Sequence, residues 1–238
     1  MTMRRRDLLT STAVALIFTL ASAEARTVAG ALPWEPDAGL PPTPAPAGPW
    51  QFFTAEEAAA VEAIVDRLIP PDPQTPGGRE AGCAVFIDRQ LAGPYGSARA
   101  LYMRPPFMDG TPQQGAQSPL TPAARYRQGL AALDKYCRQA FAGKSFAVLP
   151  DEQKDKVLGG MEKGPIVFEG ASATALFEQI LNNTREGFFA DPVYGGNRDM
   201  AGWKMIGFPG ARYDYRDWVE RHNERYPLPP VALGGTSP

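Results

Sequence analysis

Proline limits where this chain can form regular structure. Its ring fixes φ and removes a backbone N–H, so a helix or strand rarely runs through it. Seven prolines, at positions 33, 36, 41, 42, 44, 46 and 49, crowd residues 31–50. This density favours an extended, polyproline-like arm, which we place at residues 26–50. The arm serves either as a spacer, which we favour slightly, or as a strap along a partner with Trp34 and Trp50 as anchors.

Between the prolines, apolar residues recur at helical spacing. Thr54-Ala55-Glu56-Glu57 is a capping box, and an apolar stripe from Val61 to Leu68 follows it until Pro70 ends the helix. Further helices are expected from about residue 82 to 91, from Thr121-Pro122 for about four to five turns, from Pro150, and through Leu176 to about Gly187. Gly159-Gly160 is expected to weaken the end of the helix that opens at Pro150.

Strand signals are scarce, because no run of alternating β-branched residues stands out. Residues 93–119 combine Pro, Gly and polar residues without a period and predict a long loop. The 238 residues suffice for one domain with its own core. We therefore predict a mostly α fold: a single irregular helical domain at residues 51–226 with long Pro/Gly-rich loops, and a flexible tail at residues 227–238.

The first 25 residues have the pattern of an export signal. Three arginines, Arg4, Arg5 and Arg6, precede a short apolar stretch, and Ala21-Ser22-Ala23 offers a small-residue cleavage site. The paired arginines before Leu8 and Leu9 resemble a twin-arginine signal, with the general secretory route as the alternative. Twin-arginine export carries proteins that have already folded in the cytoplasm.

Composition argues against several classes of function. A net charge of −2 removes the electrostatic case for nucleic-acid binding. One histidine and two cysteines are too few for a structural zinc site or an ordinary iron–sulfur cluster. No G-x-G-x-x-G follows an apolar strand. We therefore expect no cofactor, no metal and no catalytic residue on this chain.

The two cysteines leave one structural question open. In an oxidising compartment, Cys83 and Cys137 could form a bridge that closes a loop of about 55 residues. Cys137 also lies on an apolar helical stripe, where a free thiol packs like a small hydrophobic side chain. The sequence supports both alternatives equally.

The most distinctive stretch runs from Glu186 to Gly210, and we call it the motif loop. Gly195-Gly196-Asn197 supplies residues that tolerate positive φ, and the aromatic content exceeds that of an ordinary surface loop. Aromatic and arginine residues of this kind are typical of an interface centre. The candidate partner-binding residues are Phe188, Phe189, Tyr194, Asn197, Arg198, Trp203 and Phe208. Alternatively, Phe188, Phe189, Trp203 and Phe208 form the lid of the domain's own core.

Other readings of the polar residues are weaker. Glu186, Asp191, Asp199 and Asp214 could supply a catalytic acid and base in a stand-alone exported enzyme, but no spacing fixes a pair. A calcium site from Asp191, Asn197 and Asp199 lacks EF-hand spacing. His222 lies in a charged segment typical of solvated surface. A free-standing binding module is a third alternative.

The motif loop, E-G-F-F-A-D-P-x-Y-G-G-N-R-D-x-x-G-W-K-x-I-G-F-P-G, resembles the gluconate 2-dehydrogenase subunit 3 family, and the F-F-T-x-E-E opening at Phe52 to Glu57 agrees with it. The resemblance covers most of residues 50–225. It implies a small subunit without a cofactor that assists folding and export of a large FAD-containing flavoprotein. The implied complex also holds a multihaem cytochrome c subunit. The resemblance further implies use of the twin-arginine translocase and a periplasmic location at the cytoplasmic membrane.

Overall fold

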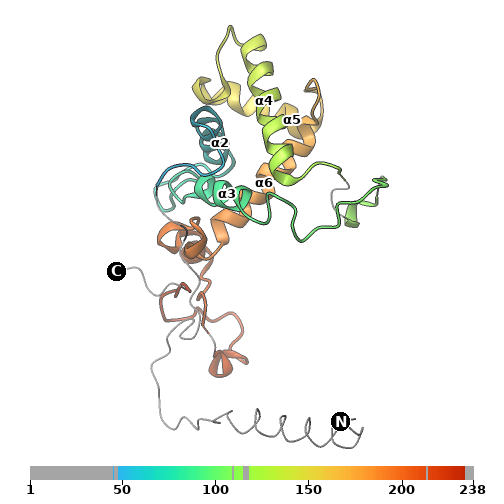
Figure 1. Ribbon diagram of the computed structural model, residues 1–238. Coiled ribbons are helices and arrows are strands. Elements are labelled where there is room, and N and C mark those ends of the chain that lie inside the picture. Colours follow the sequence, from blue (N-terminus) through green and yellow to red (C-terminus); the bar gives the residue numbers. More distant parts are fainter. Residues whose placement is uncertain (1–44, 46–47, 109, 115–117, 213, 234–238) are drawn as a thin grey trace, which may run out of the picture. The chain divides into compact units, whose positions relative to one another are not determined.

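The computed structural model describes residues 45, 48–108, 110–114, 118–212 and 214–233, all within the unit of residues 36–238. Figure 1 shows the helices of this part of the chain: α2 (Ala55–Leu68), α3 (Cys83–Ala92), α4 (Pro122–Ala140), α5 (Asp151–Lys163), α6 (Ala173–Phe189) and α7 (Ala201–Ile206). Its residues form no strand, only an isolated parallel bridge between Gly210 and Val231. The mostly α fold is confirmed.

Several expectations fall on residues outside this description. The predicted signal at residues 1–25, with Arg4, Arg5, Arg6, Leu8 and Leu9, lies outside the described residues, as do most of the arm and residues 234–238. Within the described residues, no helix combines the length and the apolar character that a membrane span requires.

The helix starts follow the predicted caps. Thr54 accepts a hydrogen bond from the Glu57 amide, and the Glu57 carboxylate accepts one from the Thr54 amide. Thr121 caps α4 through the Ala124 amide, with Pro122 in the first turn. In the predicted loop at residues 93–119, only Pro112–Gln114 forms a helical turn among the described residues, and it is of the 3-10 type.

Two helices continue past the glycines at which the sequence suggested they would weaken or end. Helix α5 runs through Gly159 and Gly160 to Lys163 and ends at Gly164, which has a φ of 85°. The predicted weakening of its end by the two glycines stays a prediction. A Cβ on Gly160 would lie 2.6 Å from Cδ1 of Ile166, so the missing side chain makes room for packing. The same holds at Gly187, where a Cβ would lie 2.9 Å from the Phe86 ring, and α6 continues to Phe189.

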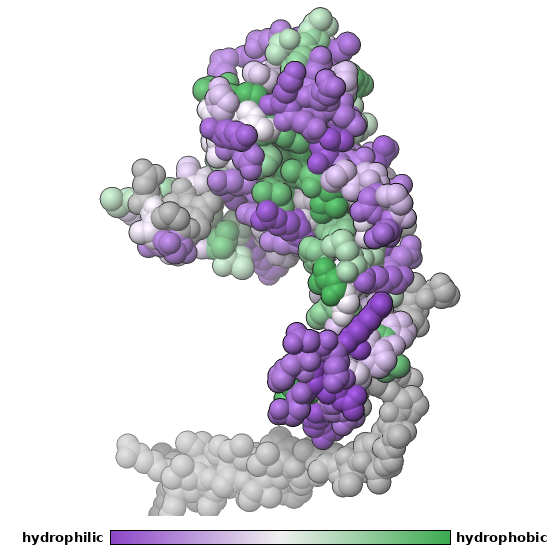
Figure 2. Space-filling model, turned by 180° about the vertical axis from the view of Figure 1, so that it is seen from behind, coloured by the Kyte–Doolittle hydropathy of each residue, from purple (hydrophilic) through white to green (hydrophobic). Residues whose placement is uncertain are grey.

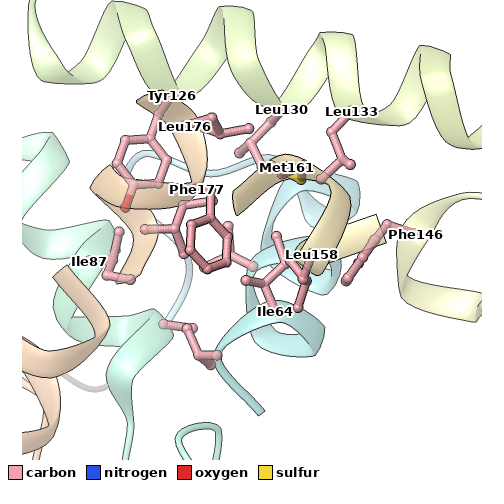
Figure 3. Close-up of a cluster of buried hydrophobic side chains, with 14 of the residues drawn as sticks. Ile64, Ile87, Tyr126, Leu130, Leu133, Phe146, Leu158, Met161, Leu176 and Phe177 are labelled. Atoms are coloured by element: carbon pink, nitrogen blue, oxygen red, sulfur yellow. The ribbon is translucent and has the colours of Figure 1, made fainter. Parts of the chain in front are cut away.

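Helix α6 is the centre of the packing, since it contacts α2, α3, α4, α5 and α7. Side chains from five helices point toward one another in the core, including Ile64, Ile87, Tyr126, Leu158 and Phe177 (Figure 3). On the outside, hydrophobic side chains gather in a band between hydrophilic ones on the face drawn in Figure 2. The core thus fixes α6, and the end of α6 carries the motif loop.

Both cysteines are free and buried in the structure, Cys83 at the start of α3 and Cys137 on α4. The bridge that the sequence allowed is not formed. Burial raises the pKa of each thiol from 9.0 to about 12, with a smaller contribution from Asp134 at Cys137. Each thiol therefore packs as a small apolar side chain, the second of the two alternatives.

Candidate partner-binding site

The motif loop begins where α6 leaves the core. Phe188 is 1% exposed, and its ring meets the Phe189 ring edge-on at 5.2 Å between centroids. Phe189 is 39% exposed. The end of α6 thus places one aromatic ring in the core and the next at the surface.

The side chain of Asn197 holds the two ends of the loop together. Its side chain is fully buried: Nδ2 donates to the Ala190 carbonyl at 2.8 Å, and Oδ1 accepts from the Gly202 amide at 2.8 Å. The backbone at Asn197 has a φ of 46°, a left-handed conformation that asparagine tolerates better than most residues. These two hydrogen bonds tie the end of α6 to the start of α7 across the turn.

Close backbone approach makes the loop rigid. A Cβ on Gly196 would lie 2.2 Å from the Gly187 carbonyl oxygen, and a Cβ on Gly202 would lie 2.2 Å from that of Phe188. The positive φ predicted for this stretch occurs at Gly195 (93°) and Asn197. It also occurs at Asp199 and Met200, where it was not predicted.

Trp203 contacts both Phe189 and Phe208, two of the exposed aromatic residues of the motif loop. Its side chain is 5% exposed, and Nε1 donates to the Phe189 carbonyl at 2.8 Å. The Phe208 ring meets the Trp203 ring edge-on at 5.2 Å and remains 44% exposed. With Met200 and Ala232, Trp203 forms a second small core, separate from the main one.

Four apolar side chains above this second core form what we call the apolar patch: Phe189, Met205, Ile206 and Phe208. Their exposed fractions run from 39% to 58%. The Phe189 ring lies against Gly202, and Ile206 is one helical turn further along α7, on the same face. The patch therefore lies on packed, hydrogen-bonded neighbours.

The seven predicted partner-binding residues divide between interior and surface. Phe188, Asn197 and Trp203 are buried, whereas Phe189, Tyr194, Arg198 and Phe208 are exposed. The lid interpretation is thus correct for Phe188 and Trp203 and does not account for Phe189 and Phe208. Ile206 was noted in the sequence only as part of the apolar content of the stretch, and Met205 was missed; both lie in a helix too short to show a period.

The arm reaches the motif loop. The Ala45 amide donates to the Val193 carbonyl at 2.6 Å. Further along, the buried carboxylate of Asp88 accepts hydrogen bonds from the amides of Gln51, Phe52 and Phe53, each at 2.9 Å. Trp50 packs beside Phe53 and against the core, so it anchors the arm to this chain.

The C-terminal segment also attaches to the motif loop. Asp191 accepts from the Val193 amide with Oδ1 at 2.9 Å and from the Leu233 amide with Oδ2 at 2.7 Å. Val231 and Ala232 are buried. Part of the segment that the sequence assigns to a flexible tail is therefore packed.

The carboxylates considered for catalysis have separate roles in the structure. Asp191 holds the backbone, Glu186 accepts a hydrogen bond from Asn183, and Asp214 pairs with Arg216. Hydrogen bonds from Arg216 lower the pKa of Asp214 to about 2, so this carboxyl is ionised and unsuited to donate a proton near neutral pH. Among the described residues, no group of three or more His, Cys, Asp or Glu side chains is placed to hold a metal ion.

The fold and the site define a class of protein: a small helical domain whose longest motif builds a rigid, partly exposed apolar surface. The chain belongs to the gluconate 2-dehydrogenase subunit 3 family, whose model matches residues 55–210, from the start of α2 to the end of the motif loop. This family implies a subunit of a multi-subunit dehydrogenase complex. No curated protein and no solved structure matches the chain.

Proposed function

We propose that this chain is the non-catalytic small subunit of a periplasmic FAD-dependent dehydrogenase of gluconate or a related sugar or polyol. In this proposal it assists maturation and twin-arginine export of the flavoprotein subunit. The observation that carries the proposal is the apolar patch, built on the motif loop of a family named for one subunit of a dehydrogenase.

The chemistry of the patch suits a protein partner. Aromatic and large aliphatic side chains dominate the centres of protein interfaces. A surface that is rigid before binding loses little conformational entropy when the partner docks. Phe189 rests on Gly202, and Phe208 rests on Trp203, so both rings are already positioned.

The proposal includes a division of labour among the subunits of the complex. FAD belongs to the flavoprotein, which oxidises the substrate, and haem c belongs to a multihaem cytochrome subunit, which passes electrons toward the membrane. The small subunit holds neither cofactor. The complex resides in the periplasm, associated with the cytoplasmic membrane.

The association is tested by Ile206→Ser, which removes an apolar side chain that is 58% exposed on the patch. We expect this variant to bind the flavoprotein at least about fivefold more weakly, because truncating a side chain at the centre of an interface costs more than about 1 kcal/mol. The matched control is Val167→Ser, at an 81% exposed position between α5 and α6. Co-purification and titration of the separated subunits measure the effect.

Both variants should unfold at the temperature of the parent chain, because both positions are exposed. Equal affinity of the Ile206→Ser variant and the parent would refute the patch as the docking surface. Equal losses in both variants would show that the effect is not specific to the patch.

A further inference from the structure

A groove of about 430 Å³ lies between α7 and the segment that precedes Val231. Trp203 and Phe208 line one side, and Tyr226 lines the other together with Pro227, Pro229 and Pro230. Aromatic-lined grooves of this kind bind polyproline-type segments, which lose little entropy on binding because they are already extended. The groove therefore has the chemistry to accept a proline-rich strand.

The wall of the groove is held in place by the Arg212 side chain and by one backbone hydrogen bond. Arg212 donates from Nη2 to the Pro229 carbonyl at 2.7 Å, and its guanidinium lies 5.3 Å from the centre of the Tyr226 ring. The Val231 amide donates to the Pro209 carbonyl at 3.2 Å. These contacts make the groove a formed surface of the chain.

The charged residues that line the groove are both cationic, Lys204 and Arg225. A proline-rich segment with an acidic side chain would be attracted to these two cations. Water and salt weaken this attraction where the charges are exposed. Residues 36–44 have this composition, P-D-A-G-L-P-P-T-P, with Asp37 as the acidic residue and Leu40 as the large apolar one.

Residues 36–44 join the described part of the chain at Ala45, which lies close to the groove. The Ala45 amide donates to the Val193 carbonyl, and the same turn is tied through Asp191 to Leu233, three residues after Pro230 of the groove. Nine residues in a polyproline conformation reach about 28 Å, at about 3.1 Å per residue. The segment is long enough to reach from Ala45 into the groove.

We propose that residues 36–44 of this chain occupy the groove, with Leu40 and the adjacent prolines against Trp203 and Phe208 and with Asp37 beside Lys204. The covalent tether favours this occupant over a second copy or a partner chain, since a short linker gives an effective concentration in the millimolar range. The contact is a property of the free subunit and goes beyond the proposed function. It covers part of Phe208 and leaves Phe189 and Ile206 accessible.

The test is a cross-link in the full chain. Leu40→Cys combined with Leu228→Cys, which lies in the groove wall, should form an intramolecular disulfide under mild oxidation about tenfold faster than Leu40→Cys combined with Val167→Cys. Val167 is exposed and lies outside the groove lining. The native Cys83 and Cys137 are buried and should not compete.

A second comparison uses charge. In the Leu40→Cys/Leu228→Cys background, Asp37→Lys should slow the cross-link several-fold, and adding Lys204→Glu should restore it. Equal rates for the two cysteine pairs would overturn the proposal. Disulfide-linked dimers as the main product would assign the groove to a second copy, and a slow cross-link that only the added flavoprotein accelerates would assign it to the complex. Each of these results contradicts docking within the free chain.

Discussion

At the scale of single residues, the buried thiols make a prediction about pH. The pKa of Cys83 and that of Cys137 are raised from 9.0 to about 12, because burial disfavours the thiolate. A group with a raised folded-state pKa contributes stability that is complete below its unfolded pKa and is lost as the pH rises through the folded value. The free energy of unfolding should therefore fall between pH 9 and 12.

The same thiols can be counted by alkylation at pH 8 without reductant. The folded chain should not react, and the unfolded chain should show two reactive groups, which matches the two free cysteines of the structure. The control is the double variant Cys83→Ala/Cys137→Ala, which should show no reaction and a weaker alkaline loss of stability. Absence of reactive thiols in the unfolded parent chain would reveal the bridge that the sequence left open.

The residue types of the motif loop predict part of its backbone conformation and side-chain exposure, but not all of it. Gly195 and Asn197 are residues that favour positive φ, and both adopt it. Asp199 and Met200 adopt it as well. Aspartate tolerates this conformation better than most residues, whereas methionine does not favour it. At Met200 the hydrogen bond from the Gly202 amide to Asn197 holds the backbone in place. The exposure of Ile206 could not be predicted either. It depends on how the Phe189 ring packs against α7, which is a contact between two helices.

At the scale of elements, two helical glycines should respond oppositely to the same change. Gly202→Ala places a Cβ 2.2 Å from the Phe188 carbonyl oxygen, so α7 must move away from α6, at a cost of about 1–3 kcal/mol in the free energy of unfolding. Gly159→Ala meets nothing within 4 Å and should stabilise α5 by about 0.5–1 kcal/mol. Denaturant unfolding measures both variants.

A destabilised Gly159→Ala variant would contradict the open space beside α5, and a neutral Gly202→Ala variant would contradict the close contact of α6 and α7. Circular dichroism of both variants serves as the control for helix content, which should be unchanged in Gly159→Ala.

Elements were predictable where caps and periodicity agree, as in α2 and α4, because both signals are local. The end of a helix was not predictable where a glycine leaves room for a neighbouring side chain instead of ending the helix. Gly187 resembles a helix end in the sequence, yet in the structure it admits the Phe86 ring against α6. Helix α7 has six residues, fewer than the apolar periodicity needs to become visible.

At the scale of the whole molecule, the proposed role makes a prediction about export. Changing Arg4, Arg5 and Arg6 to Lys should abolish the twin-arginine signal of this chain while leaving its mature sequence unaltered. Because the flavoprotein is proposed to cross the membrane bound to this subunit, its activity in the periplasm should fall to the level seen when this chain is deleted.

Fractionation with an FAD-linked activity assay measures this outcome, and the matched control is Arg26→Lys, a conservative change just after the predicted signal. Undiminished periplasmic activity in the triple variant would refute joint export. Accumulation of active flavoprotein in the cytoplasm would support it.

The attachment of Ala45 and Leu233 to one short turn has a consequence for engineering. Ala45 bonds to Val193, and Leu233 bonds to Asp191, so the two backbone positions lie close together. A short Gly/Ser linker could join them, and new termini could be opened at the exposed turn of Ala142 and Gly143. Such a circular permutant should retain the helical domain and carry its chain ends at that turn, away from the motif loop.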